Sequence, residues 1–369
     1  MTEGVEHRQP TLSDVARRAG VSRSLASLAL RGEAGVRPDK RDRIFKAAAE
    51  LNYHPNLIAR TLASAGAHSI GVVVGRIVDP LQAAVVQEID RIAVAAGYDV
   101  LLSITAETDE GAEQSVRMLM ARRVAGVLLV GAPRAKSSIA RVAKMVAATY
   151  IGRLLASVEI DSVSTDDRFG ARMAVDHLVS LGHENIAHVS GGNEPGAIRR
   201  REGYEAAMAD HGLEALVIDG GYTVDDGASG MLRLFDRGRR PSAVFCAHDL
   251  SAFGLMSEAH RMRVAVPGML SVVGYGDVEL AATDTLALTT INQPAAQLAE
   301  AGVNGLIQRI GKPSTPVTKT LVEPSLVVRH STASPDAIRT RTAFAHLKAG
   351  SPTGPEPRAR RQRTRLPSP

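Results

Sequence analysis

The sequence predicts a small all-α domain followed by an α/β core of two lobes, each built on a parallel sheet. Residues 1–62 contain short helical segments and no strand signal. From residue 70 the chain alternates short runs of Val, Ile and Leu with Ala-rich stretches, which is the pattern of buried parallel strands joined by helices. Eight strand candidates lie between residues 70 and 275. A single mononucleotide-binding half has fewer strands, so this number indicates two lobes.

The composition is that of a globular protein from a reducing compartment. The chain has 369 residues, 44% hydrophobic and 22% charged, which excludes a fibre or a wholly disordered chain. Its single cysteine, Cys246, excludes an intramolecular disulfide and a multi-cysteine metal site, and is expected to be a core residue. The N-terminus MTEGVEHRQP has no apolar signal region, and no apolar run reaches 18 residues. We therefore expect a cytoplasmic protein without a membrane partner.

Charge is distributed unevenly along the chain. Residues 1–62 contain 11 Lys and Arg against 7 Asp and Glu, and residues 331–369 contain 8 against 2. Because phosphate neutralisation supplies the sequence-independent part of nucleic-acid affinity, this excess favours a polyanion as the partner of a chain end. The alternative is that the arginines only keep the protein soluble. Residues 331–369 lack periodic apolar residues and are expected to form a disordered basic tail.

Three short helices are predicted near the N-terminus. Thr11 and Asp14 form a capping box that begins the first helix, whose apolar face holds Leu12, Val15, Ala16 and Ala19. A glycine ends this helix directly. Ser22 caps a second helix over roughly 23–30, and Pro38 starts a third that carries Ile44, Ala47, Ala48 and Leu51. This is a helix-turn-helix pattern, in which the second helix enters the major groove of DNA, although helical bundles that bind no DNA share it.

The core is predicted from alternating strands and helices. The strand candidates are 70–74, 98–104, 124–130, 146–151, 185–190, 215–219, 243–247 and 271–275, and the helices between them include 82–96, 110–122, 169–181, 198–211 and 249–262. The chain is expected to leave the first lobe near 155–165 and to cross back near 288–294. Ligands of open α/β sheets bind beyond the carboxyl ends of the strands, so a cleft between the lobes is the expected ligand site.

Six motifs in order across residues 11–294 point to a family. They are TLSDVARRAGVS, ELNYHPNLIARTLASAGAHSIGVVV, LVSLGHENIAHVSG, PSAVFCAHDLSAFGLM, LSVVGYGDVELA and LALTTINQP. Over about residues 10–330 the chain resembles the lactose/galactose-repressor (LacI/GalR) family of bacterial transcription regulators. The resemblance implies a homodimer or tetramer with an N-terminal helix-turn-helix, a hinge helix and a two-lobed core like that of periplasmic sugar-binding proteins.

From the composition, the helix pattern and the resemblance together, the chain is expected to have five parts. They are a flexible N-terminus (1–10), a helix-turn-helix DNA-binding domain (11–55), a hinge helix and linker (56–69), a two-lobed effector-binding and dimerisation core (70–330), and the basic tail (331–369).

The hinge is expected to fold only when docked. Residues 56–63 (NLIARTLA) are too few for a helix that is stable alone in water. In the family this segment pairs with that of the dimer mate in the minor groove, where a leucine at the position of Leu62 wedges between base steps and kinks the duplex. The alternative is that Leu62 packs against the core.

The second helix departs from the family pattern. The usual Thr, Val and Arg are replaced by Leu25, Ala26 and Leu28. Arg31 stands where Asn is common, so an unusual operator is expected. Arg23 and Ser24 are the candidates for base-edge contacts, with Leu25 near a thymine methyl. At Arg37 the common Ser is missing, which weakens the third helix's N-cap. The predicted DNA-binding residues, including phosphate contacts, are Thr11, Ser22, Arg23, Ser24, Leu25, Ser27, Arg31, Asn56, Ala59, Arg60 and Leu62.

The effector residues also follow from the resemblance. Arg200 matches the family position whose guanidinium grips effector oxygens. Asp249 matches the effector carboxylate, with capping of the helix that it begins as the alternative role. Tyr222 falls where an aromatic ring often stacks on the ligand, whereas Leu81 and Gln82 replace frequent aromatics.

Other polar residues complete the expected site. Asp277 remains, but Gly276 replaces the Asp common before it, which is a departure from a sugar site. Asp166 is a further polar candidate. The predicted effector residues are Asp79, Leu81, Gln82, Arg200, Tyr222, His248, Asp249, Asp277 and Gln293.

Together these features predict a sequence-specific DNA-binding transcription regulator, a repressor, whose operator affinity is set by a small molecule such as a sugar bound between the lobes. Its partners would be operator DNA, the effector and a second copy of the chain, at the nucleoid. One alternative is a solute-binding protein, which would share this core but would need an export signal, and no such signal is found in this sequence. A carbohydrate-modifying enzyme is the other alternative, but no zinc, phosphate-loop or nucleophile motif has the required spacing. No catalytic residue, metal or cofactor is therefore expected.

Overall fold

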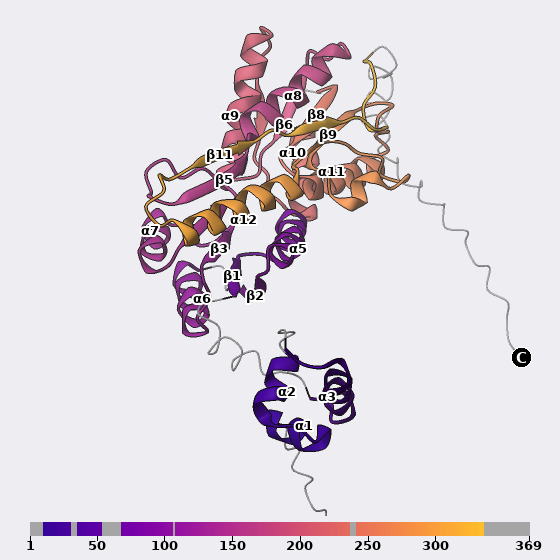
Figure 1. The fold of residues 1–369 in the computed structure, drawn as a ribbon. Helices are drawn as coiled ribbons and strands as arrows, with labels where there is room; N and C mark the ends of the chain where they lie inside the picture. Colours follow the sequence, from indigo (N-terminus) through magenta and orange to yellow (C-terminus); the bar gives the residue numbers. More distant parts are fainter. Residues whose placement is uncertain (1–9, 31–34, 54–67, 106–107, 237–240, 336–369) are drawn as a thin grey trace, which may run out of the picture.

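The computed structural model describes residues 10–30, 35–53, 68–105, 108–236 and 241–335 (Figure 1). The predictions for the N-terminal segment, the hinge and most of the tail lie outside these ranges. None of the helices in the described ranges is long and apolar enough to span a bilayer.

The N-terminal domain has the three predicted helices, α1 (Leu12–Ala19), α2 (Arg23–Leu30) and α3 (Pro38–Glu50). The capping box is confirmed: the Asp14 N–H donates to Thr11 Oγ1 (3.3 Å), and the Thr11 N–H donates to the Asp14 carboxylate (2.9 Å). Gly20 takes the left-handed backbone (φ +65°) that ends α1. The small core of this domain contains Val15, Ala16, Ala19, Ala26, Ala29, Ile44, Ala47 and Ala48.

The caps of α2 and α3 also follow the sequence. The Leu25 N–H donates to Ser22 Oγ (3.2 Å), so Ser22 caps α2 as predicted. At Arg37 no side chain caps α3, and the Arg37 guanidinium instead contacts the Asp39 carboxylate at 3.3 Å. The start of α3 therefore rests on the fixed φ of its first residue, a proline.

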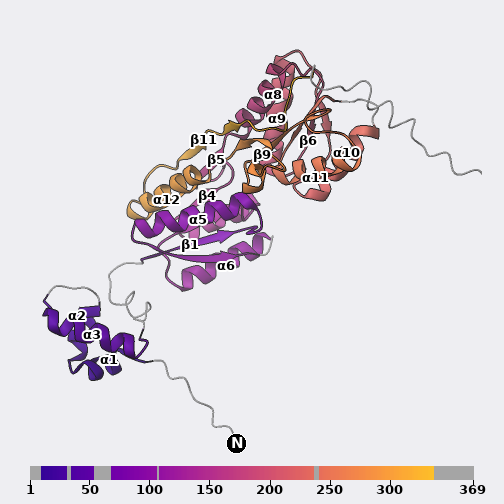
Figure 2. The same ribbon diagram turned by 90° about the vertical axis from the view of Figure 1, so that its right-hand side faces the viewer.

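The first lobe is a six-stranded parallel sheet with helices on both faces (Figure 2). Its order is β11-β5-β4-β3-β1-β2, with β1 (Ser69–Val74), β2 (Asp99–Ile104), β3 (Val127–Val130), β4 (Ala148–Ile151), β5 (Asp161–Thr165) and β11 (Lys319–Val322). One face packs on α5 (Pro80–Ala95) and α12 (Ala295–Gly311), and the other on α6 (Asp109–Ala121) and α7 (Lys136–Met145).

The second lobe repeats this plan. Its order is β12-β10-β9-β8-β6-β7, parallel except for β12, with β6 (Ile186–Val189), β7 (Leu216–Ile218), β8 (Ala243–Cys246), β9 (Ser271–Gly276), β10 (Thr289–Asn292) and β12 (Ser325–Val327). α8 (Asp167–Ser180) and α9 (Pro195–Asp210) cover one face, and α10 (Val224–Asp236) and α11 (Asp249–Arg261) the other; η1 (Glu279–Ala282) follows β9. Cys246 is buried in β8, as predicted.

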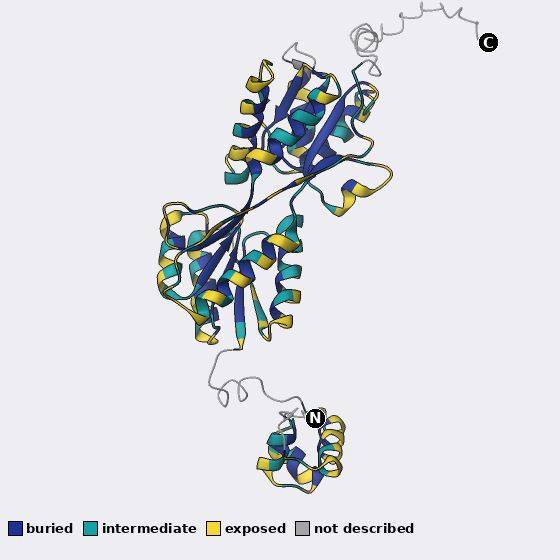
Figure 3. Cartoon of the chain, turned by 45° about the horizontal axis from the view of Figure 1, so that its top comes forward, coloured by how far each residue is buried: buried dark blue, intermediate teal, exposed yellow. Residues whose placement is uncertain are grey.

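Within the described ranges the chain crosses between the lobes three times, at residues 166, 293–294 and 323–324 (Figure 3). The crossing predicted near 288–294 is confirmed. The crossing predicted near 155–165 comes later, because β5 still belongs to the first sheet. The third crossing was not predicted, since β11 and β12 are edge strands with exposed positions and lack the continuous apolar run of a buried strand.

The predicted tail boundary at residue 331 is too early. Ser331 is fully buried, and its hydroxyl donates to the Val272 carbonyl (2.6 Å) and accepts from the Thr289 N–H (2.8 Å). The Ala333 carbonyl lies 2.9 Å from Nε2 of the buried His183. The second lobe therefore extends at least to these residues.

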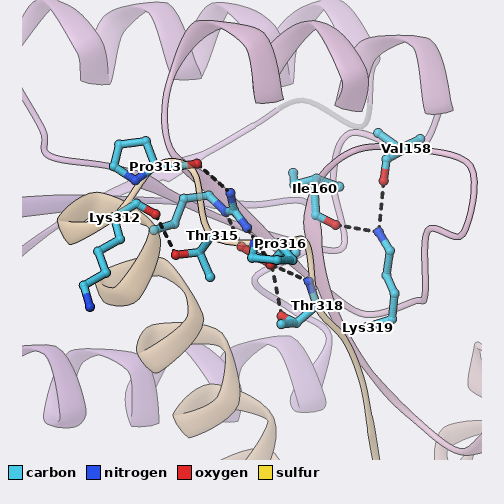
Figure 4. A network of polar contacts seen from close by, with 10 residues as sticks. Val158, Ile160, Lys312, Pro313, Thr315, Pro316, Thr318 and Lys319 are labelled. Atoms are coloured by element: carbon cyan, nitrogen blue, oxygen red, sulfur yellow. Dashed lines mark hydrogen bonds and ion pairs between the residues drawn. The ribbon is translucent and has the colours of Figure 1, made fainter.

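A polar network ties α12 and β11 to the start of β5. Arg309 forms an ion pair with Asp161, and the Thr318 N–H donates to the Asp161 carboxylate (2.7 Å). The Lys319 ammonium donates to the carbonyls of Val158 (2.9 Å) and Ile160 (2.6 Å; Figure 4). Burial raises the pKa of Asp161, but the hydrogen bonds from Arg309 and Thr318 outweigh it, and this pKa lies below its ordinary value.

We predict that Asp161→Asn lowers the free energy of unfolding by about 2–3 kcal/mol at pH 7, because Arg309 loses its charged partner. The lowered folded-state pKa means that the stabilisation is present above the unfolded-state pKa and is lost as the pH falls through the folded-state value. Urea unfolding from pH 7 to pH 3 should therefore show the difference from the parent shrinking in acid. The control Glu159→Gln, at an exposed site nearby, should change stability by less than about 0.5 kcal/mol. A deficit that is constant with pH would contradict this account.

Candidate effector site and nucleic-acid interface

Helix α2 presents a polar face to solvent. Arg23 and Ser24 are exposed, while Ala26 and Ala29 are buried against α1 and α3. Leu25 is half-buried. Among the predicted DNA-contacting residues, the described ones therefore include an exposed arginine and serine at the first turn of the second helix.

Two hydroxyls of the predicted interface are already engaged. Thr11 Oγ1 donates to Asp14 (2.6 Å), and Ser22 Oγ caps α2. Ser22 is exposed and Ser27 half-buried. The remaining predicted DNA contacts lie outside the described residues; they are Arg31, Asn56, Ala59, Arg60 and Leu62.

A cavity of about 150 Å³ lies between the two lobes. It is lined from the first lobe by segments that follow β1, β3 and β4, and from the second lobe by segments that follow β6, β7 and β8. These are the carboxyl ends of parallel strands, where open α/β sheets bind ligands. Seven of the nine predicted effector residues line it: Asp79, Leu81, Gln82, Arg200, Tyr222, His248 and Gln293.

Arg200 is the most highly bonded side chain on the second-lobe side of the cavity among the described residues. Its side chain is 6% exposed, and Nε donates to the Asp167 carboxylate (2.8 Å). Nη1 donates to the Ala247 carbonyl (2.6 Å) and Nη2 to Gln293 Oε1 (2.9 Å). The guanidinium also lies 3.8 Å from the centroid of the Tyr275 ring. Burial lowers the pKa of Arg200, but Asp167 outweighs this and raises it, so the side chain stays charged.

The partners of Arg200 place it at two of the three crossings. Asp167 begins α8 directly after the first crossing, and Gln293 lies in the second crossing, between β10 and α12. Arg200 is therefore bonded to two of the three segments that connect the lobes. A ligand that contacts this guanidinium can act on both segments.

Tyr222 and His248 add two neutral groups. Their rings meet edge to face with centroids 5.0 Å apart. Burial, followed by Arg200 and Arg76, lowers the pKa of His248 to about 3, so the imidazole is uncharged at neutral pH. Its Nδ1 accepts from the Leu250 N–H (3.2 Å) and caps α11. Burial raises the pKa of Tyr222 to about 12, although Arg200 opposes the rise.

Among the described residues, an ion pair links the two lobes across the cavity. The Arg134 guanidinium, which follows β3, lies 2.7 Å from the Glu194 carboxylate, which precedes α9. Arg153, which follows β4, donates to the Arg134 carbonyl. On this side of the cavity the two lobes are therefore joined by the Arg134–Glu194 ion pair, and Arg153 is bonded to the backbone of Arg134.

Comparison with known proteins decides the family. Residues 11–56 match the model for bacterial regulatory proteins of the lacI family, and residues 175–332 match that for a periplasmic binding protein-like domain. The chain is 31% identical over 330 residues to the transcriptional regulator GalR of Salmonella typhimurium, covering 88% of this chain and 96% of GalR. The chain belongs to the LacI family of bacterial regulatory proteins.

Other relatives of this LacI-family chain agree. It is 30% identical over 327 residues to the ribose operon repressor of Escherichia coli (87% of this chain, 99% of the relative). Its fold matches the lac repressor dimer bound to operator and the anti-inducer ONPF, with a TM-score of 0.78 at 28% identity, covering 88% of this chain and all of the lac repressor chain. The chain is therefore a DNA-binding transcription regulator with a small-molecule effector, as the motifs predict, and not an enzyme.

Two effector predictions need correction. Asp249 lies outside the cavity lining and is fully buried: it accepts hydrogen bonds from the Thr290 hydroxyl (2.6 Å) and the Val278 N–H (2.9 Å). Its alternative role is also wrong, because His248 caps α11. Asp277 likewise does not line the cavity, and its carboxylate forms an ion pair with Arg329 at 2.7 Å.

Sequence reasoning missed five charged residues of the cavity. They are Arg76, Arg134, Arg153, Asp167 and Glu194. The three arginines and Glu194 each lie within five residues of the carboxyl end of a strand that was predicted, and this position was the available signal. Asp167 was not predicted, whereas its neighbour Asp166 was named as a polar candidate and caps α8 by accepting from the Phe169 N–H (3.1 Å).

We predict that Asp249→Ala lowers the free energy of unfolding by about 2–3 kcal/mol and leaves effector affinity within about twofold, because the carboxylate supports backbone and Thr290 rather than ligand. Urea unfolding and ligand titration measure the two quantities. The control Asp277→Asn removes the charge of a partly exposed ion pair while keeping a residue that tolerates the left-handed backbone at this position, and it should cost no more than about 1 kcal/mol. Normal stability with lost effector binding in Asp249→Ala would restore this residue to the effector site.

Proposed function

We propose that this LacI-family chain is a repressor that acts as a homodimer on a nearly palindromic operator in the cytoplasm, at the nucleoid. Its operator affinity is set by a small molecule in the cavity between the lobes. The observation that carries this proposal is Arg200, a buried charge at the cavity wall that is bonded to two of the crossing segments. The structure of the lac repressor relative with both operator and anti-inducer supports the coupling of the two sites.

The mechanism follows from the arrangement of the core. Residues on both lobes line the cavity, so an effector stabilises the lobe arrangement that it contacts best. In a dimer, a change in lobe arrangement alters the spacing of the two segments that lead to the DNA-binding domains. The effector shifts this balance only by binding the two states unequally, and DNA then changes effector affinity by the same factor.

We assign DNA recognition to the first domain. Arg23 and Ser24 are exposed at the start of α2 and are the proposed base-edge contacts, since arginine binds guanine O6 and N7 as a fork. Ser22 and Arg60 are proposed to contact phosphates, which position the protein without specifying sequence. Leu62 is the proposed minor-groove wedge.

For Leu62→Ala we expect operator affinity to fall about 10- to 100-fold, because the kinked duplex loses its wedge, while affinity for random duplex changes less than about threefold. Fluorescence anisotropy with labelled operator and random DNA at one salt concentration measures both. The operator itself is obtained by genome-wide capture of bound DNA. Equal losses on both duplexes would rule out a wedge at this residue.

Arg200→Lys tests the coupling while keeping a positive charge beside Asp167. Lysine cannot reproduce the guanidinium fork, so effector response should weaken at least about tenfold, whereas operator affinity without effector should stay within about threefold. Titration of the operator complex with the effector found by a ligand screen measures this. Arg201→Lys is the matched control, because Arg201 is exposed and pairs with Glu205. An unchanged titration in Arg200→Lys would remove this residue from the effector site.

A further inference from the structure

The cavity wall carries more positive than negative charge. Its lining contains four guanidinium groups, those of Arg76, Arg134, Arg153 and Arg200, and three carboxylates, those of Asp79, Asp167 and Glu194. Three of the four arginines belong to the first lobe, which contributes one carboxylate.

The carboxylates of this wall are committed to protein partners. Asp167 binds Arg200 (2.8 Å), and Glu194 binds Arg134 (2.7 Å). Asp79 accepts from the Gln82 N–H (3.0 Å) and so caps α5. Sugar hydroxyls need acceptors as well as donors, and these three groups are the acidic acceptors that the described cavity offers.

The two amide acceptors are also in use. Gln82 Oε1 accepts from the Arg76 N–H (2.9 Å), and Gln293 Oε1 accepts from Arg200 (2.9 Å). A polyol would therefore share these oxygens with the protein donors that already bind them, because each oxygen can accept a further hydrogen bond. A ligand rich in acceptors would not need these oxygens.

Donor capacity remains on the first-lobe wall at Arg153. Its guanidinium donates to the Arg134 carbonyl and lies 5.9 Å from the Tyr150 ring centroid. Its Nε is buried and has no hydrogen-bond partner among the described residues. No carboxylate of the described residues lies within ion-pair distance of this group, in contrast to Arg134 and Arg200.

The positive field reaches the second lobe. Burial is the main cause that lowers the pKa of His248, whose ring faces Tyr222 at the cavity, and the charges of Arg200 and Arg76 lower this pKa further. Charges on both walls thus act on the same space between the lobes, where partial exclusion of water strengthens their attraction for an anion. The cavity, of about 150 Å³, has room for several water molecules and for a ligand of sugar size.

We propose that the effector of this site is a small anion of monosaccharide size, bearing a carboxylate or a phosphate, that is recognised by the guanidinium groups of Arg153 and Arg76 on the first lobe and Arg200 on the second. Arginine binds both anions through paired N–H groups. An anion held from both walls draws the lobes together. This inference deepens the proposed function, because it names the class of effector for the same cavity.

The test uses purified full-length protein and matched pairs of ligands. Gluconate, glucuronate and glucose 6-phosphate are compared with glucose, and ribose 5-phosphate with ribose, by calorimetric titration and thermal melting. We expect at least one anion to bind at least about tenfold more tightly than its neutral parent, and the sugar acids and sugar phosphates separate carboxylate from phosphate recognition.

Variants identify the residue responsible. Arg153→Gln should weaken binding of the anion at least about tenfold and leave binding of neutral sugars unchanged. Arg122→Gln, at an exposed arginine of the same lobe, is the control and should bind like the parent. If Arg153→Gln melts at the parent temperature, the loss is not caused by unfolding; Arg153→Lys, which keeps the charge, should recover part of the affinity.

The outcomes separate this inference from the proposed function. Neutral sugars that bind as well as the anions, or no anion binding across the panel, would overturn the anionic effector and leave a regulator with another ligand class. Anion binding that Arg153→Gln does not weaken would overturn the recognition scheme. Anion binding that leaves operator affinity unchanged would instead contradict the proposed function while the site stands.

Discussion

A single charged side chain, held away from water, organises the space between the lobes. Arg200 stays ionised in the interior because Asp167, Gln293, the Ala247 carbonyl and the Tyr275 ring each take up part of its guanidinium. Leaving one member of such a buried pair without its partner costs about 3–5 kcal/mol. Since these partners come from two crossings and from the end of β8, the charge fixes how those segments meet.

The pairing of buried charges also explains why positive charge is in excess at the cavity. Asp167 and Glu194 each neutralise one arginine, and the first-lobe Arg153 lines the cavity without a carboxylate within ion-pair distance among the described residues. Asp249 and Asp277, by contrast, are spent on the second lobe itself, where they hold the turn after β9 to β10 and to Arg329. The acidic residues near the cavity thus form two groups: Asp167 and Glu194 line it, whereas Asp249 and Asp277 stabilise the second lobe behind it.

Local chemistry made much of the fold predictable. Thr11 with Asp14, Ser22 and Pro38 set helix starts through bonds within a few residues, and the sequence contains everything that decides them. Strands such as β1 and β3 are continuous apolar runs that are buried on both faces. Strand β5 (DSVST) is equally buried but polar, and its place in the sheet depends on pairing with β4 and β11, far away in the chain.

The site was predictable where a residue matches a family position. Arg200 was found in this way, whereas Asp166 and Asp167 are adjacent acids with no local difference between them. One caps a helix and the other binds an arginine 33 residues away, a choice made by tertiary packing. Asp249 shows the reverse error: its position at the start of α11 resembles an effector contact, but Thr290 and Val278 turn it inward.

The three crossings also decide the order in which the protein can be assembled during synthesis. The first sheet needs β11 (Lys319–Val322) for its edge and α12 for one face, and the second needs β12 (Ser325–Val327). Neither sheet is complete until nearly the whole core has left the ribosome, although domains generally fold from the N-terminus as they emerge. The N-terminal three-helix domain has its own core and does not depend on these strands. It can therefore fold on a nascent chain before the effector-binding core is complete.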